Sequence, residues 1–193
     1  MNATKIHFVA FFLSALALGG CAGQLYKVAT PPASPPPVIS TNNASGLNAG
    51  AVVLDGDLSI EQFEANLPLA GVVPIDVKLS NQSSNTIDLK KLRFELGDGA
   101  KTKFKQIGPQ QALSRVIGFY GDSFYRVDAR KRTQENYLAI ALKLERPLDQ
   151  QEERRGFLFF ESKSQPVKLD GLILSIKGAA IPINIQLNGK TDK

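Results

Sequence analysis

Several reactive side chains are scarce in this 193-residue sequence, which contains one cysteine (Cys21), one histidine (His7), one methionine and no tryptophan. With a single cysteine, no disulfide can form within the chain, so its stability has to come from a packed core. His7 lies in an N-terminal segment that we expect to be removed. The remaining chain then has no catalytic group that depends on histidine, and no histidine-based metal site.

The N-terminal segment has the pattern of a signal peptide. Lys5 supplies a positive charge, and the thirteen residues Ile6–Leu18 are apolar apart from His7 and Ser14. A membrane-spanning helix needs about 20 apolar residues, whereas the apolar region of a signal peptide has about 7–15. We therefore expect residues 1–20 to direct export and then to be cleaved.

The sequence Leu18-Gly19-Gly20-Cys21 resembles the lipobox of bacterial lipoproteins. This resemblance implies cleavage between Gly20 and Cys21 and attachment of acyl chains, palmitate among them, to Cys21. Ala22 stands where an aspartate would signal retention in the inner membrane of enterobacteria, so the resemblance favours the outer membrane. The alternative is an ordinary secretory signal with an incidental cysteine.

A linker is expected between the anchor and the folded body. Residues 22–50 carry one charge, Lys27, and contain five prolines between Pro31 and Pro37. Such a composition cannot bury enough apolar surface to fold. We therefore expect acylated Cys21 and a Pro/Asn/Ser-rich linker in residues 21–50, a folded domain in residues 51–188, and a polar tail in residues 189–193.

Most of the expected domain has the pattern of β-strands. Phe157–Phe160 is apolar on both faces, which predicts a central strand covered on both sides. Pro74 and Pro182 lack a backbone N–H, so their strands should lie at a sheet edge or begin near the proline. Elsewhere apolar residues alternate with polar ones, as in half-buried strands, at Val73, Ile75, Val77 and Leu79, at Leu92, Phe94 and Leu96, at Leu172, Leu174 and Ile176, and at Ile181, Ile183, Ile185 and Leu187.

The middle of the chain predicts a helical insertion at about residues 109–145. A short helix should run from Pro109 to Ile117, and a longer one, capped by Asp122 or Ser123, should run towards Glu145. Residues 138–144 also alternate, so a strand is the alternative there. Two pairs spaced i,i+4 would support the longer helix: Asp128 with Arg132, and Lys131 with Glu135.

Short strands with one helical insertion predict a mainly β fold, namely a β-sandwich. Residues 74–81, 94–99, 156–161 and 172–174 resemble, in their order, the immunoglobulin-like (telokin-like) domains of bacterial surface lipoproteins. The resemblance implies an immunoglobulin-like sandwich with an adhesive or scaffolding role and attaches no reaction to it. The chain lacks the core tryptophan and the disulfide of antibody domains.

Possible catalytic and metal-binding residues are not distinctive. The acidic pairs Glu61 with Glu64, Glu152 with Glu153, and Asp55 with Asp57 are better explained as surface charges, and Asp55-Gly56-Asp57 as a turn. Ser162-Lys163 has the composition of a loop. Gly118-Phe119-Tyr120-Gly121 reads as a helix break packed in the core, with a partner-facing surface as the alternative.

One local concentration of positive charge could form a partner or anion surface: Arg126, Arg130, Lys131 and Arg132. We expect a non-enzymatic envelope lipoprotein, held on the membrane through Cys21, whose sandwich binds or scaffolds another envelope protein by sheet-edge or loop contacts. The alternatives are a module that binds envelope glycan or anionic lipid and a carboxylate-based cell-wall hydrolase. No cofactor, metal or nucleic acid is expected.

Overall fold

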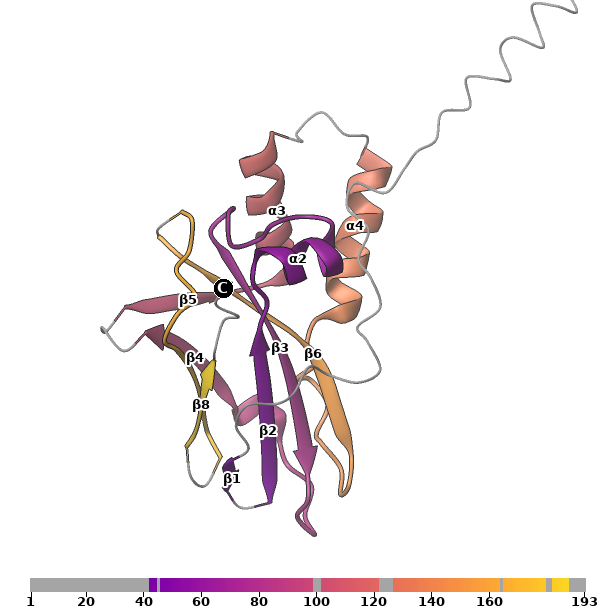
Figure 1. Cartoon of the computed structure of the whole chain (residues 1–193). Helices are drawn as coiled ribbons and strands as arrows, with labels where there is room; N and C mark the ends of the chain where they lie inside the picture. The colour runs from indigo at the N-terminus through magenta and orange to yellow at the C-terminus, as the bar shows by residue number, and fades with distance from the viewer. Residues whose placement is uncertain are drawn as a thin grey trace, which may run out of the picture.

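The fold is built on eight antiparallel strands that form one continuous sheet (Figure 1). The computed structural model describes residues 42–44, 46–98, 102–121, 127–163, 165–179 and 182–187. The strand order is β1-β2-β3-β6-β5-β4-β7-β8. The strands are β1 (Asn42–Ala44), β2 (Leu47–Val53), β3 (Val72–Asn81), β4 (Arg93–Asp98), β5 (Lys103–Ile107), β6 (Glu153–Glu161), β7 (Leu172–Lys177) and β8 (Ile183–Leu187).

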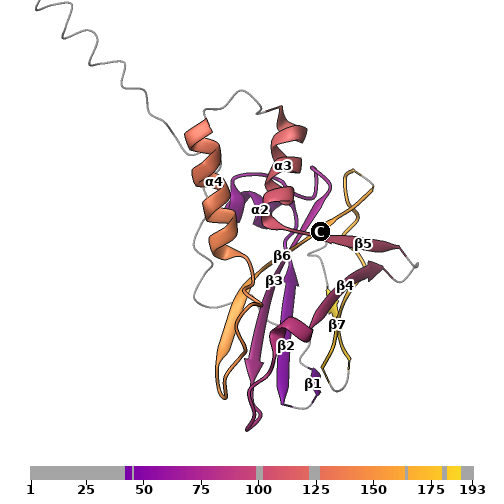
Figure 2. The same ribbon diagram turned by 180° about the vertical axis from the view of Figure 1, so that it is seen from behind.

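Three α-helices and one short 3₁₀ helix complete the described part of the chain. They are α2 (Gly56–Phe63), η1 (Leu89–Lys91), α3 (Pro109–Tyr120) and α4 (Val127–Ile140). All three α-helices lie at one end of the sheet (Figures 1 and 2). The prediction of a mainly β fold with a helical insertion is confirmed.

The sheet curls so that its two halves face each other across one apolar core. Strand β5 joins the halves, because Ile107 pairs with Phe159 of β6 while Phe104 pairs with Leu96 of β4. The two layers of the expected sandwich are therefore parts of one sheet. The core contains the alternating apolar residues of six strands, including Leu47, Ala49, Val73, Ile75, Val77, Leu79, Phe94, Leu96, Leu158, Phe160, Leu172, Leu174, Ile176, Ile183 and Ile185.

A second apolar core lies between the helices and the outer face of β6. Phe157 and Phe159 point into it, whereas Leu158 and Phe160 point into the first core. Strand β6 lies between β3 and β5, so the prediction of a central, doubly covered strand is confirmed. The second core also contains Phe63, Leu67, Leu113, Val116, Ile117 and Tyr137.

Helix α3 agrees with the prediction and extends three residues beyond it. Pro109 occupies the first turn, where a missing N–H is harmless, and Gly121 ends the helix with φ of 73°. Helix α4 ends at Ile140, so the predicted end at Glu145 is wrong. Ala141 forms an isolated parallel bridge with Phe157, but residues 138–144 do not form the strand that was the alternative. The expected caps Asp122 and Ser123 lie outside the described residues.

Helix α2 was not expected, and the turn predicted at Asp55-Gly56-Asp57 is wrong. The Asp55 side chain accepts a hydrogen bond from Leu58 N at 2.9 Å and so caps the first turn of α2. The helix buries Ser59, Gln62 and Phe63. Two polar residues on this buried side weakened the apolar periodicity that would have predicted a helix.

The folded body begins before the boundary expected at Ala51. Residues up to 50 were assigned to the linker, but residues 42–44 form β1 and residues 47–50 form the first half of β2. The inward residues of β2 are Leu47, Ala49, Ala51 and Val53, all of them buried. Alanine and the intervening Asn48 and Gly50 made this alternation hard to distinguish from linker composition.

The two prolines behave differently. Pro182 immediately precedes β8, which is the last strand of the sheet, as predicted. Strand β3, with Pro74 at its third position, lies inside the sheet rather than at an edge. The Pro74 carbonyl accepts from Leu54 N at 3.1 Å, just after β2 ends at Val53. Because the N and O of one strand residue point the same way, the missing N–H of Pro74 faces the end of β2.

Candidate functional site

Three of the four basic residues singled out in the sequence lie in the described part of α4, and they do not share one face of the helix. Arg130, Lys131 and Arg132 are all exposed, and they follow one another along α4. Successive helical residues are rotated by about 100°, so these three side chains spread around the helix. The buried side of α4 carries Ala129, Thr133 and Tyr137. Arg130 and Arg132 lie on either flank of this buried side, and Lys131 lies on the opposite face of the helix.

Two of these cations have interactions of their own. Lys131 Nζ lies 4.0 Å from Glu135 Oε1, as the i,i+4 spacing predicted. Arg132 also interacts within the protein, but the side chain of Asp128, its expected partner, is outside the described residues. Arg126 lies outside them too, as do Gly20 and Cys21, the residues of the expected cleavage and acylation site. The three cations on α4 therefore do not form a single anion-binding face, and a surface that includes Arg126 stays a prediction.

Exposed apolar side chains gather where α3 ends and α4 begins, instead of packing in the core as expected. The helix break expected at Gly118–Gly121 falls at Gly121, where α3 ends after Tyr120. Phe119 and Tyr120 are 42% and 40% exposed, and their rings pack edge to face with centroids 5.0 Å apart. Val127 begins α4 at the same end of the molecule and is 84% exposed (Figure 2).

The loop after α2 is fixed to this end of α3. The Asn66 N–H donates to the Tyr120 hydroxyl at 3.2 Å, and the hydroxyl can donate to the Asn66 carbonyl at 3.3 Å. Asn66 Oδ1 also accepts from Leu69 N at 3.0 Å. Through Asn66, these bonds link the loop that carries Leu69, itself 39% exposed, to Tyr120 at the end of α3. We call Leu69, Phe119, Tyr120 and Val127 the hairpin end.

Sequence reasoning found half of the hairpin end. It singled out Phe119 and Tyr120 but assigned them to the core, and it missed Leu69 and Val127. Seven large hydrophobic side chains are exposed among the described residues, and four of them belong to the hairpin end. The signal in the sequence was the aromatic pair directly before Gly121, a helix-ending glycine, which places both rings at a helix terminus.

The paired carboxylates take structural roles. Glu152 Oε1 accepts from Arg154 Nη2 at 2.7 Å, and its Oε2 accepts from Asp149 N at 2.9 Å. These bonds, those from Arg154 first, lower the pKa of Glu152 to about 2. Its neighbour Glu153 points to the other face of β6, where its carboxylate lies 2.8 Å from Lys78 Nζ. Glu152 and Glu153 therefore do not face a common substrate space.

Arg154 fixes the segment that leads from α4 back to the sheet. Its guanidinium donates to three carbonyl oxygens, those of Lys143 at 3.2 Å, Arg146 at 2.5 Å and Pro147 at 2.8 Å. The Arg154 side chain is 10% exposed. A largely buried charge is costly unless it is hydrogen-bonded, and these acceptors supply the hydrogen bonds that the guanidinium needs. We therefore assign Arg154 a structural role.

The free edges of the sheet approach each other. Strand β8 lies beside β1 and β2: some of its Cα atoms are within 8 Å of Cα atoms in β1, and some are within 8 Å of Cα atoms in β2 (Figure 1). A partner strand inserted between them would need about 4.8 Å on each side, or roughly 9.6 Å in all. The contact of a partner at the sheet edge, which the sequence suggested, would therefore require this seam to open.

No group of three or more His, Cys, Asp or Glu residues placed to hold a metal ion occurs in the described ranges. None of the helices in those ranges is long and apolar enough to span a membrane.

The comparisons with known proteins add little to this geometry. No protein-family model and no curated protein sequence matches the chain. Among solved structures, the yjhA protein from Bacillus subtilis is similar over 78% of this chain and 98% of its own, with 10% identity and a TM-score of 0.41.

Proposed function

We propose that the protein is a non-enzymatic, lipid-anchored component of the bacterial cell envelope, whose sandwich body binds or scaffolds another envelope protein. Acylated Cys21 would hold the protein on the membrane. The outer membrane is favoured because Ala22 stands where an aspartate would signal retention in the inner membrane. The residues from Ala22 to the first strand would act as a tether. The hairpin end would be the surface that contacts the partner.

The clustering of exposed apolar side chains at the hairpin end carries this proposal. Isolated exposed hydrophobic residues are common on soluble proteins, but several together on one projecting end are typical of an interaction surface. Phe119 and Tyr120 are already fixed against each other and against Asn66. A partner would thus bury rigid aromatic area at a small cost in side-chain entropy.

Two further observations favour a contact role over a reaction. Two of the acidic residues considered for hydrolysis have structural partners: Asp55 caps α2, and Glu152 binds Arg154. The exposed cations of α4 are spread around the helix, which favours the apolar hairpin end over an anion surface as the main contact.

Crosslinking in intact cells tests the proposal. The acylated protein would be purified and the co-purifying proteins identified by mass spectrometry. We expect one near-stoichiometric partner, which the double variant Phe119→Ser/Val127→Ser loses. The matched control is Ile173→Ser, because Ile173 is 37% exposed and lies on β7, outside the helical layer.

Equal melting temperatures of the two variants would show that both remain folded. Unchanged capture by Phe119→Ser/Val127→Ser would overturn the assignment of the hairpin end. Recovery of the wild-type protein alone would overturn the protein-binding role and move attention to envelope glycan or anionic lipid as the ligand.

A further inference from the structure

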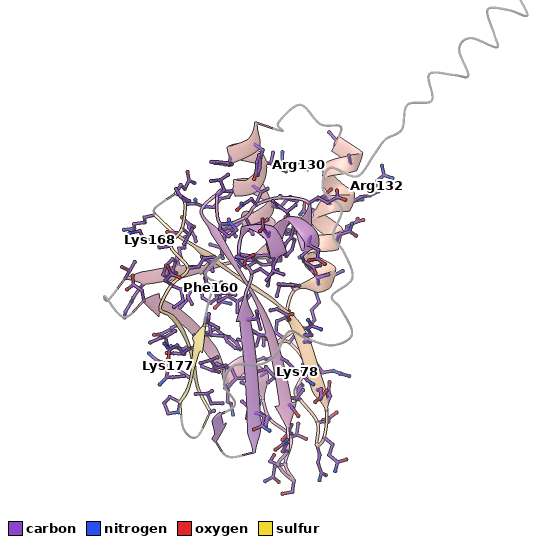
Figure 3. All side chains as sticks on the ribbon, viewed as in Figure 1. Lys78, Arg130, Arg132, Phe160, Lys168 and Lys177 are labelled. Carbon is purple, nitrogen blue, oxygen red and sulfur yellow. The ribbon has the colours of Figure 1, made fainter. Side chains whose placement is uncertain are left out.

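A polar groove lies on the face of the sheet that also carries the helices, at the end of the sheet away from them. Two adjoining hollows of about 180 and 330 Å³ form it, and they share Ser80, Gln82 and Glu153. The first hollow adds Asn48, Gly50 and Lys78, and the second adds Gln151. Figure 3 shows Lys78 on the part of the sheet beyond the helical layer.

The first hollow lies over the pairing of two strands. Gly50 of β2 pairs with Lys78 of β3, and both line the hollow. The exposed surface of this hollow is mainly carbon. Such a surface can receive a group that presents C–H bonds.

The walls carry polar side chains that are not used by the protein itself. Within the described part of the chain, the side chains of Asn48, Ser80, Gln82 and Gln151 form no hydrogen bond or ion pair. Amides and hydroxyls both donate and accept hydrogen bonds. Between them lies the ion pair of Lys78 and Glu153, which adds a donor and an acceptor without net charge.

The backbone of Gln151 supplies an independent observation. Gln151 has φ of 57°, a conformation in which glycine is free of strain and other residues are not. Among the described residues, Glu64 at the end of α2 is the other non-glycine with positive φ. Gln151 thus places a long amide side chain at the rim of the groove in a position where folding alone would favour glycine.

We propose that this polar groove binds a neutral saccharide with hydroxyl and acetamido groups, such as a glycan of the cell envelope. The mainly carbon surface of the first hollow suits the C–H face of a sugar ring. The amide side chains suit its hydroxyl and acetamido groups, each of which donates and accepts. The absence of net charge in the groove disfavours a charged ligand. The groove is remote from the hairpin end, so this inference goes beyond the protein-binding role and does not depend on it.

Titration of the full-length mature protein with a tetramer of N-acetylglucosamine, followed by calorimetry, tests the proposal. Asn48→Ala and Gln151→Gly should each weaken binding by roughly tenfold, the effect of losing one or two hydrogen bonds. Asn184→Ala is the control for the first variant, because Asn184 lies on the outer face of β8, away from the groove. Glu64→Gly is the control for the second.

Gln151→Gly separates a binding role from a structural one. Glycine relieves the positive φ, so the variant should keep or raise the melting temperature of the protein while it loses affinity. A lower melting temperature with unchanged affinity would overturn the proposal.

The remaining outcomes also decide the question. No binding of the tetramer at millimolar concentration would overturn the proposal, as would equal affinities of the groove variants and their controls. A glucose tetramer, which lacks the acetamido groups, should bind at least tenfold more weakly; equal binding would overturn the assignment of that group. Phe119→Ser/Val127→Ser should keep full affinity for the sugar, so this proposal and the proposed function can fail separately.

Discussion

Arg155 on β6 reaches diagonally to β3, where its Nε donates to both carboxylate oxygens of Asp76, at 2.9 and 3.0 Å. The side chains are 19% and 7% exposed. In the register of the sheet, Asp76 lies opposite Phe157, which belongs to the second core. The ion pair therefore lies at the boundary between the helical layer and the polar groove.

Replacing Arg155 by methionine should destabilise the protein by about 3 kcal/mol, because Asp76 would keep a largely buried charge without its partner. Urea denaturation measures the change. The double variant Arg155→Met/Asp76→Val should recover most of the loss, since it removes both charges. A double variant as unstable as the single one would show that packing, and not the unpaired charge, causes the effect.

Glu152 should make stability depend on pH in the acid range. Its pKa is lowered from 4.5 to about 2 in the folded protein, chiefly by the hydrogen bond from Arg154. A lowered pKa gives stability that is present above about 4.5 and is lost as the pH falls towards 2. The urea midpoint should thus fall less between pH 6 and pH 3 in Glu152→Gln than in the wild type. Parallel pH profiles of the two proteins would contradict this.

Tyr137→Phe should stabilise the protein by about 1 kcal/mol. Tyr137 is fully buried between Phe63 and Phe159, and its hydroxyl has no hydrogen-bond partner within the described residues. Removing an unsatisfied buried hydroxyl without changing the shape of the ring removes a desolvation cost. Denaturation at pH 7 measures the gain, and a loss of stability would reveal a partner of the hydroxyl.

The same hydroxyl predicts a change at alkaline pH. Burial raises the pKa of Tyr137 above its ordinary value of 10.0. The folded state therefore disfavours the ionised form, and this contribution to stability declines as the pH rises above 10. The advantage of Tyr137→Phe over the wild type should grow above pH 10. A constant difference between the two proteins would contradict the assignment.

Gly156 should tolerate no side chain. A Cβ at this position would lie 2.5 Å from the Cα and N of Leu142, which crosses directly over the strand. Backbone atoms cannot move aside cheaply, so Gly156→Ala should cost about 3 kcal/mol or more. Gly118→Ala is the control: nothing lies within 4 Å of its Cβ in α3, and the gain in helix propensity should stabilise by about 0.5–1 kcal/mol. Similar melting temperatures of the two variants would contradict this contrast.

Acylation of Cys21 stays a prediction from the sequence. Cys21→Ser should release the protein from the membrane fraction, because no acyl chain can be attached to serine through a thioether. The mass of the purified wild-type protein should exceed that of residues 21–193 by the mass of its acyl groups. A wild-type mass without this excess would contradict the lipobox reading.

Strands could be predicted where apolar residues alternate with strongly polar ones, as in β7 and β8, and where both faces are apolar, as in β6. Helix α3 carried its start and end signals in Pro109 and Gly121. The first half of β2 was missed because alanine and glycine give a weak contrast. Helix α2 was missed because its buried side includes Ser59 and Gln62. Local patterns of this kind carry little information where tertiary packing decides burial.

The candidate surfaces were harder to predict than the strands. A run of cations in the sequence looked like a patch, but consecutive residues of a helix diverge around its axis. The hairpin end depends on Asn66, which links the loop of Leu69 to Tyr120, 54 residues further along the chain. The groove is lined by residues of β2, β3 and β6, which the pairing of these strands brings together. Neither arrangement has a local signature, since each arises from the register of the folded chain.

Because β6 lies between two apolar cores, the helices cannot be removed without exposing one face of this strand. Phe157 and Phe159 would face water if the helices were cut away, while Leu158 and Phe160 on the same strand would still be needed inside the sheet. The helices are therefore not a removable module. A shorter relative without them would need polar residues at positions 157 and 159, so those two positions should distinguish, in any set of sequences, the proteins that carry a helical layer from those that do not.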